Sequence, residues 1–299
     1  MILLLIEAIR PKQWTKQIFV ILPIISLGKE ITLYDLWYGL IACTLFTLAS
    51  SIVYIFNDLN DIEKDRKDSV KANRPLASGR LPITMAKVWG FFLLFLLIAL
   101  TFNLSNNRIA IAYCLFAYLA VNFCYSFFDL KRFALPGIFL VAIGFPLRFL
   151  VGTLVLNLQF SFWGTALIME LALVLLAGKR YQSTKRSALV DKSSAKDSAS
   201  NLDGDLMFWL LSLVAFISAF IATYANFIAS PEIEKAWGGS LLLFTIIPLI
   251  MGLARYLEIV THVKSFKVKD STESLINDPT LMIIGLIYVT NLFFARIYA

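Results

Sequence analysis

Residues 36–65, LWYGLIACTLFTLASSIVYIFNDLNDIEKD, join two very different kinds of sequence. The 21 residues 36–56 contain no charged side chain, whereas five of the nine residues 57–65 are charged. About 20 consecutive apolar residues are enough for a helix to cross the hydrocarbon layer of a bilayer. This stretch therefore predicts a transmembrane helix that ends in a dense group of charges at the membrane surface.

Similar apolar runs recur along all 299 residues, of which 59% are hydrophobic and 16% charged. A soluble domain carries about 25% charged residues. Because lipid cannot satisfy backbone polar groups, each run should be a helix. We expect an all-α bundle of nine transmembrane helices with a polar cavity that faces the cytoplasm, forming one intramembrane domain over residues 1–299. The expected spans are 16–30, 36–56, 87–104, 108–127, 135–156, 160–178, 206–229, 239–257 and 279–298. The Ser- and Lys-rich segment 183–203 is expected to be a loop.

The positive charges of the connections are unequally distributed between the two sides of the membrane. The connections after the first, third, fifth and seventh spans carry only Lys29, Arg108 and Lys235. The other connections carry many lysines and arginines, which are typical of cytoplasmic loops. The distribution predicts that the N-terminus and the long loops of this cell-membrane protein are cytoplasmic and that the C-terminus is outside.

Asp58, Asp61 and Asp65 are spaced i, i+3, i+7 at the cytoplasmic end of the second span. If the helix continues through them, they lie within about 60° of one another and over ~10 Å of its axis. Mg²⁺ takes one or two carboxylates and completes its shell with water and phosphate oxygens. Lys71 and Arg74 follow, so that a polyanion such as a diphosphate could be held from both sides. A solvated helix end in a basic loop is the alternative interpretation.

These residues resemble motifs of the UbiA superfamily of intramembrane prenyltransferases. NDxxDxxxD corresponds to residues 57–65 and KxxRPxxSG to residues 71–79. The second aspartate motif of the aromatic prenyltransferases is replaced by the cations Lys179 and Arg180. Three further segments are similar to the decaprenyl-phosphate phosphoribosyltransferase branch: RPKQWTK at 10–16, YSFFDLK at 125–131 and GFPLRFLVG at 144–152. The sequence departs from this branch in the Tyr-to-Lys spacing of the second segment and in the region of Leu135, Pro136 and Gly137.

The resemblance implies a transferase that moves 5-phosphoribose from phosphoribosyl diphosphate to a polyprenyl phosphate lipid and releases diphosphate. It implies Mg²⁺ as cofactor, held by Asp58, Asp61 and Asp65. The residues expected to bind the diphosphate are Asn57, Lys71, Arg74, Lys131, Lys179 and Arg180. The residues expected to contact the substrates are Lys16, Tyr125 and Arg148.

Two other functions are compatible with parts of the pattern. A prenyltransferase would use the same metal site with a prenyl diphosphate donor and an aromatic or other small acceptor. A transporter for an anionic metabolite fits less well, because transporter sites lie near the midplane between repeats. A homo-oligomer is compatible with the sequence, and no nucleic-acid partner is expected.

Some candidate residues also have structural interpretations. Arg148 and Glu170 lie within predicted spans, where an ionisable group points to a functional site. They could instead pair with each other and hold their two helices together. Tyr125 could stack on a substrate, or it could belong to the aromatic belt at the membrane border.

Overall fold

The computed structural model describes residues 1–25, 31–68, 71–104, 106–128, 130, 133–191, 199–230, 233, 239–262 and 278–297. Within these ranges all regular secondary structure is helical. The chain divides into two compact units, residues 1–161 and 162–299, and each is described by itself. That the whole chain forms one domain stays a prediction.

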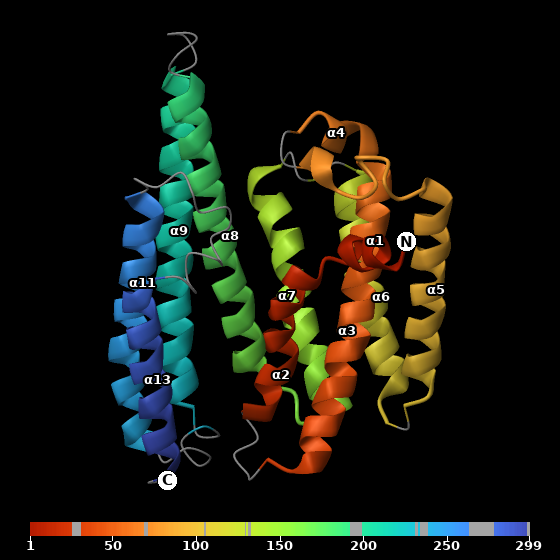
Figure 1. Ribbon diagram of the computed structural model, residues 1–299. Helices are drawn as coiled ribbons and strands as arrows, with labels where there is room; N and C mark the ends of the chain where they lie inside the picture. Colours follow the sequence, from red (N-terminus) through yellow and green to blue (C-terminus); the bar gives the residue numbers. More distant parts are fainter. Residues whose placement is uncertain are drawn as a thin grey trace. The chain divides into compact units, whose positions relative to one another are not determined.

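The first unit contains all the elements that precede Ser161 (Figure 1). In chain order they are α1 (Ile2–Ala8), the 3₁₀ helix η1 (Pro11–Gln17), α2 (Ile18–Ile25), α3 (Leu33–Asn60), α4 (Ile62–Arg66), η2 (Lys71–Asn73), α5 (Ile83–Phe102), α6 (Arg108–Phe127) and α7 (Ala134–Val155).

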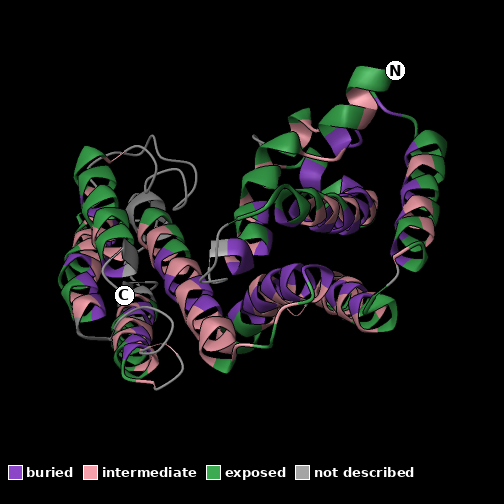
Figure 2. Ribbon diagram, turned by 90° about the horizontal axis from the view of Figure 1, so that it is seen from below, coloured by how far each residue is buried: buried purple, intermediate pink, exposed green. Residues whose placement is uncertain are grey.

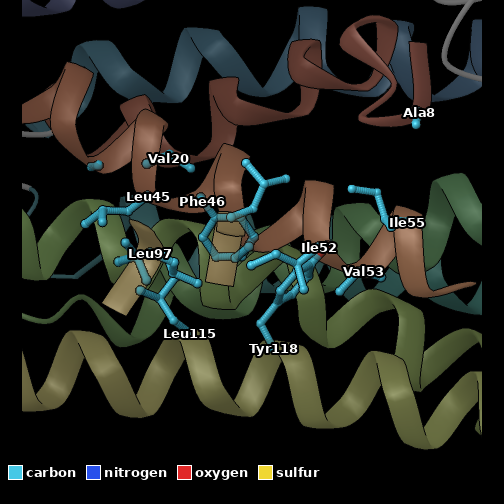
Figure 3. Packing of buried hydrophobic residues seen from close by; sticks show 14 of the residues in the cluster. Ala8, Val20, Leu45, Phe46, Ile52, Val53, Ile55, Leu97, Leu115 and Tyr118 are labelled. Carbon is cyan, nitrogen blue, oxygen red and sulfur yellow. The ribbon is translucent and has the colours of Figure 1, made fainter. Parts of the chain in front are cut away.

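Helix α3 is the centre of the first unit, and α2, α5, α6 and α7 all pack against it. It begins with a capping box in which Thr32 Oγ1 accepts from the backbone N–H of Asp35, and Asp35 accepts from the backbone N–H of Thr32. Such reciprocal hydrogen bonds satisfy two backbone N–H groups that have no partner within the first turn of a helix. The buried side chain of Phe46 packs on Tyr118 of α6, with a ring separation of 4.6 Å (Figure 3).

The outer face of the first unit is apolar, as expected for contact with lipid. Phe91, Phe92 and Phe95 of α5 are at least half exposed. The buried residues of α3 and α7 lie on the sides that face the other helices of the unit (Figure 2). Since lipid tails are as apolar as these rings, close packing has to hold the helices together.

Helices α2 and α7 approach each other most closely at Gly152. A Cβ atom at this position would lie 2.0 Å from the backbone oxygen of Val20, closer than any real contact. Glycine is therefore required here by the separation of the two backbones, as is common where membrane helices cross closely.

The second unit consists of α8 (Phe162–Asp191), α9 (Ala199–Ile228), η5 (Gly239–Thr245), α11 (Ile246–Thr261) and α13 (Pro279–Ile297). Tyr224 of α9 joins three of these elements, because its hydroxyl bonds to Thr245 Oγ1 over 2.7 Å and to the hydroxyl of Tyr288 over 2.9 Å. At one end, Arg255 donates to Asp278 over 2.8 Å, and this hydrogen bond holds the pKa of Asp278 below its usual value.

Seven helices of the described part of the chain are long and apolar enough to cross a membrane. They are Leu33–Asn60, Ile83–Phe102, Arg108–Phe127, Ala134–Val155, Phe162–Arg186, Gly204–Ile228 and Leu241–Thr261. The first and ninth predicted spans correspond to the shorter helices α2 and α13. An all-helical membrane protein is thus confirmed, whereas the number nine and the cytoplasmic cavity stay predictions.

The loop expected over residues 183–203 was wrong for most of its length. Helix α8 continues to Asp191, and α9 already begins at Ala199. Lysine, arginine, alanine and leucine in residues 184–191 are good helix formers, so that helix α8 can extend beyond its apolar part.

Candidate functional site

The candidate site lies at the end of the first unit where α3 ends and α4 begins (Figure 1). Helix α3 ends at Asn60, and Asp61 has non-helical torsions of −101° and 11°, so that the continuous helix considered for the three aspartates does not form. Hydrogen bonds of the helical kind nevertheless continue across the break, from Asp61 N to Asn57 O and from Asp65 N to Asp61 O. Asp58 and Asp65 lie on either side of the break and still reach the same partner.

That partner is Arg74. Its Nη1 atom donates to Asp65 Oδ2 over 2.5 Å and to Asp58 Oδ1 over 3.1 Å. Both aspartates are buried: Asp58 is 4% exposed and Asp65 is 3% exposed. Lys71 adds a second cation, with its Nζ 3.9 Å from Asp65 Oδ1. Two buried carboxylates repel each other unless a cation lies between them, and the arginine supplies that cation.

The backbone after η2 fixes the position of Arg74. The carbonyl of Arg74 accepts from the backbone N–H of Ser78 over 2.9 Å and from its hydroxyl over 2.7 Å. Gly79 has a φ of 74°, in the left-handed region that glycine adopts without strain. The turn at Pro75–Gly79 thereby holds the backbone of Arg74, whose side chain reaches Asp58, 16 residues earlier in the chain.

Sequence reasoning missed Arg10, which forms an ion pair with Asp58 on the same oxygen that Arg74 contacts. Its guanidinium also lies over the ring of Tyr54, 4.9 Å from the centroid. The signal for it was present, because Arg10 is the first residue of the RPKQWTK segment.

The other residues of the acidic motif have different environments. Asn57 Oδ1 is buried and has no hydrogen-bond partner in the described part of the chain. Asp61 Oδ1 lies 4.0 Å from Lys64 Nζ, and the Asp61 side chain is 23% exposed. Glu63 pairs with Arg66 and its side chain is 79% exposed, so that it is not part of the buried acidic cluster.

The oxygen atoms of Asn57, Asp58, Asp61 and Asp65 are of the kind that Mg²⁺ prefers. Over the residues that the structure describes, no three acidic, histidine or cysteine side chains form a metal-binding group. One or two carboxylates are sufficient for Mg²⁺ when phosphate and water complete its shell. The donor set therefore fits this ion, provided that guanidinium groups release at least one carboxylate oxygen.

The remaining predicted site residues lie in several places. Lys16 is half-buried in the last turn of η1, and Tyr125 is half-buried in the last turn of α6. Lys131 lies outside the described residues. Lys179 is exposed and Arg180 half-buried on α8 of the second unit, so that their grouping with the aspartates stays a prediction.

Arg148 lies in the core of the first unit, with 4% exposure. Its guanidinium is 4.7 Å from the ring centroid of Phe46 and 5.1 Å from that of Tyr118. Nη1 donates to the carbonyl of Gly144 over 2.6 Å and Nη2 to the Tyr118 hydroxyl over 3.3 Å, whereas Nε is buried without a partner. In the described residues no carboxylate neutralises this cation.

Glu170 lies on α8 of the second unit. Its Oε1 accepts from Thr223 of α9 over 2.8 Å, and its Oε2 is buried without a partner in the residues described. Arg148 belongs to the first unit, so that the pairing of Arg148 with Glu170 stays a prediction.

Comparison with known proteins decides the family. The model of the UbiA prenyltransferase family matches residues 20–194, more than half of the chain. The chain belongs to this family. Relatives from several bacteria carry the name decaprenyl-phosphate phosphoribosyltransferase. The protein from Mycolicibacterium smegmatis is 30% identical over 84% of this chain and 80% of its own length. The protein from Mycobacterium tuberculosis is 28% identical over 84% of this chain and 81% of its own length.

Solved structures of the family share the fold. A UbiA homolog from Archaeoglobus fulgidus bound to DMAPP and Mg²⁺ has a TM-score of 0.67 at 15% identity, covering 99% of both chains. A structure described as digeranylgeranylglyceryl phosphate synthase has a TM-score of 0.65 at 19% identity, covering 100% of this chain and 99% of the other. The family model and the named relatives establish that the chain is a transferase of the membrane, and the solved structures share its helical fold.

Proposed function

We propose that this protein transfers 5-phosphoribose from phosphoribosyl diphosphate to a polyprenyl phosphate. The observation that carries the proposal is the name shared by relatives with about 30% identity, decaprenyl-phosphate phosphoribosyltransferase, together with the mixed acidic and basic cluster around Asp58 and Arg74. The cations Lys179 and Arg180, in place of a second aspartate motif, support a polyanionic substrate.

The reaction breaks the bond between the sugar C1 and the diphosphate oxygen, and the diphosphate leaves with the electron pair. A phosphate oxygen of the lipid forms the new bond to C1. Because this oxygen is already anionic at pH 7, no side chain has to remove a proton. The main task of the protein is to stabilise the negative charge of the leaving group.

The residues of the cluster divide this task. Lys71 and Arg74 both pair with Asp65 in the structure, and they would donate hydrogen bonds to the diphosphate oxygens. Asp58, Asp61 and Asp65 would hold Mg²⁺, and Asn57 would contact the diphosphate. The ion supplies a compact positive charge that neutralises the leaving group. The residues proposed as further contacts to the substrates are Lys16, Tyr125, Lys131, Lys179, Arg180 and Arg148.

The location of the cluster suits a reaction between a soluble and a lipid substrate. The polar residues follow directly after the long apolar helix α3. We place this end, together with the N-terminus, on the cytoplasmic side of the cell membrane, with nine spans and the C-terminus outside. The distribution of positive charges supports this orientation.

The test is an assay with two pairs of substrates in detergent or in nanodiscs. With Mg²⁺, phosphoribosyl diphosphate and polyprenyl phosphate, we expect release of diphosphate and a new phosphoribosyl lipid. A second reaction contains a prenyl diphosphate and an aromatic acid. Release only in the second reaction would refute the proposal and identify a prenyltransferase.

A further inference from the structure

Arg10 occupies one of the two carboxylate oxygens that Asp58 offers to the proposed metal site. It contacts Asp58 Oδ1, and Arg74 Nη1 lies 3.1 Å from the same oxygen. A carboxylate oxygen that accepts from two guanidinium groups has no lone pair left for a metal ion. The positive charges would also repel a divalent cation at this distance.

The charges of this group are already balanced. Asp58, Asp61 and Asp65 contribute three negative charges, and Arg10, Lys71 and Arg74 contribute three positive charges. Adding a divalent ion alone would leave a net charge of +2 in a buried place, which is unfavourable. Adding the ion together with a diphosphate would not, because the diphosphate brings negative charge of its own.

Arg10 is held in this place by a segment that is anchored on both sides. Its backbone has a φ of 52°, a left-handed conformation that is strained for a residue other than glycine. Before it, Glu7 of α1 accepts two hydrogen bonds from Arg80, over 2.9 and 3.1 Å. After it, Gln17 is buried and donates to Ser50 of α3. The contact with Asp58 thus compensates a strained backbone at the middle of the segment.

The segment also has apolar anchors. Ala8 is buried, and Leu4, Leu5 and Ile9 pack against the core of the first unit. The ion pairs of Glu7 and Arg10 add polar contacts to this packing and fix the Arg10 side chain beside Asp58.

We propose that Arg10 is an exchangeable counterion of Asp58. In the protein without donor it neutralises the carboxylate, and when metal and donor bind it leaves Asp58 and contacts the diphosphate. No covalent bond changes in this exchange. The second half of the proposal rests on the proposed function, because it requires a diphosphate donor, whereas the competition with the metal does not.

The competition predicts that metal alone binds weakly and that donor and metal strengthen each other's binding. Replacing Arg10 by glutamine removes the competitor and leaves Asp58 with Arg74. A charge-assisted hydrogen bond is worth about 1.5–3 kcal/mol, so we expect the R10Q protein to bind metal about tenfold more tightly or better.

The experiment measures Mn²⁺ binding by electron paramagnetic resonance in nanodiscs, without any substrate. Wild type, R10Q and K12Q are compared. Lys12 is an exposed cation of the same segment, so K12Q removes the same charge without touching Asp58. Tighter Mn²⁺ binding in R10Q but not in K12Q supports the proposal. Equal affinities of wild type and R10Q would overturn it, and equal increases in both variants would reduce it to a general charge effect.

A second arm separates this inference from the proposed function. With Mg²⁺ present, we expect phosphoribosyl diphosphate to bind R10Q about tenfold more weakly than wild type, as a lost contact to a charged group predicts. If neither protein binds phosphoribosyl diphosphate while R10Q still binds metal more tightly, the proposed function is refuted. The competition between Arg10 and the metal for Asp58 is then still supported.

Wild-type protein provides a test that needs no variant. Hydrogen exchange of residues 8–17 should become faster when Mn²⁺ alone saturates the protein, because release of Arg10 removes an anchor of the segment. Unchanged exchange at saturating metal would contradict the exchange of Arg10, even if R10Q did not fold.

Discussion

Asp58 and Asp65, seven residues apart in the chain, share one nitrogen atom of Arg74. Both carboxylates are buried, so each would be costly without this cation. The same contact that stabilises the two carboxylates also places a guanidinium group where a diphosphate is proposed to bind. Arg74 should therefore contribute both to the stability of the folded protein and to the proposed reaction.

Replacing Arg74 by glutamine should lower the free energy of unfolding by about 1–3 kcal/mol, because two buried carboxylates then face each other with one cation fewer. Arg74→Lys keeps the charge but not the fork of donors, so a smaller loss is expected. Thermal unfolding in detergent measures both. If Arg74→Gln melted like wild type, Arg74 would not be the structural partner of these carboxylates.

Asp58→Asn and Asp61→Asn should each lower the turnover of the proposed reaction by about 10²-fold or more, the typical cost of one lost electrostatic contact to the leaving group. The proteins should remain folded by circular dichroism and size-exclusion chromatography. Glu63→Gln is the matched control, since that exposed carboxylate pairs with Arg66 and should leave turnover unchanged. Wild-type-like turnover in the aspartate variants would remove the proposed metal site.

Arg148→Met replaces a buried cation by an apolar side chain of similar length. Such replacements are often neutral or stabilising, because no buried charge remains to be satisfied. We expect a melting temperature close to that of wild type and at least about a tenfold loss of turnover, as for an intramembrane cation that serves a substrate. Normal turnover with a changed melting temperature would instead assign Arg148 to stability.

Gly152→Ala should strongly destabilise the first unit, because the new Cβ would lie 2.0 Å from the backbone oxygen of Val20. The two helices must then separate, which we expect to cost about 1–3 kcal/mol, as for other overpacked positions. Gly285→Ala in α13 is the control, since no atom lies within 4 Å of its Cβ. Alanine is the better helix former, so this control should melt at the same temperature or higher.

Asp278→Asn should lower the melting temperature slightly at pH 7, where the wild-type carboxylate pairs with Arg255. This pairing lowers the pKa of Asp278 in the folded protein below its usual value of 3.8. The ion pair therefore contributes fully to the stability of the folded state above pH 3.8. The contribution is lost as the pH falls through the folded-state pKa. The two melting temperatures should therefore converge below pH 3.8. A constant difference down to lower pH would contradict the ion pair as its cause.

Much of the fold follows from local sequence. Residues 36–56 predict a helix, and α3 spans them completely. The prediction succeeds because a helix satisfies every backbone group inside its own segment, which lipid makes obligatory. The interruption at Asp61 was not predicted, because the hydrogen bonds on its two sides are those of an ordinary helix.

For the candidate site, the sequence determined the donors and their spacing: Asp58, Asp61 and Asp65 beside an apolar helix, with Arg74 soon after. Tertiary structure decided which of them meet. It brought Arg10 to Asp58 across 48 residues and enclosed Arg148 between aromatic rings. Contacts between helices depend on how their surfaces fit and on how far side chains reach, and neither is encoded in the local pattern of apolar and charged residues.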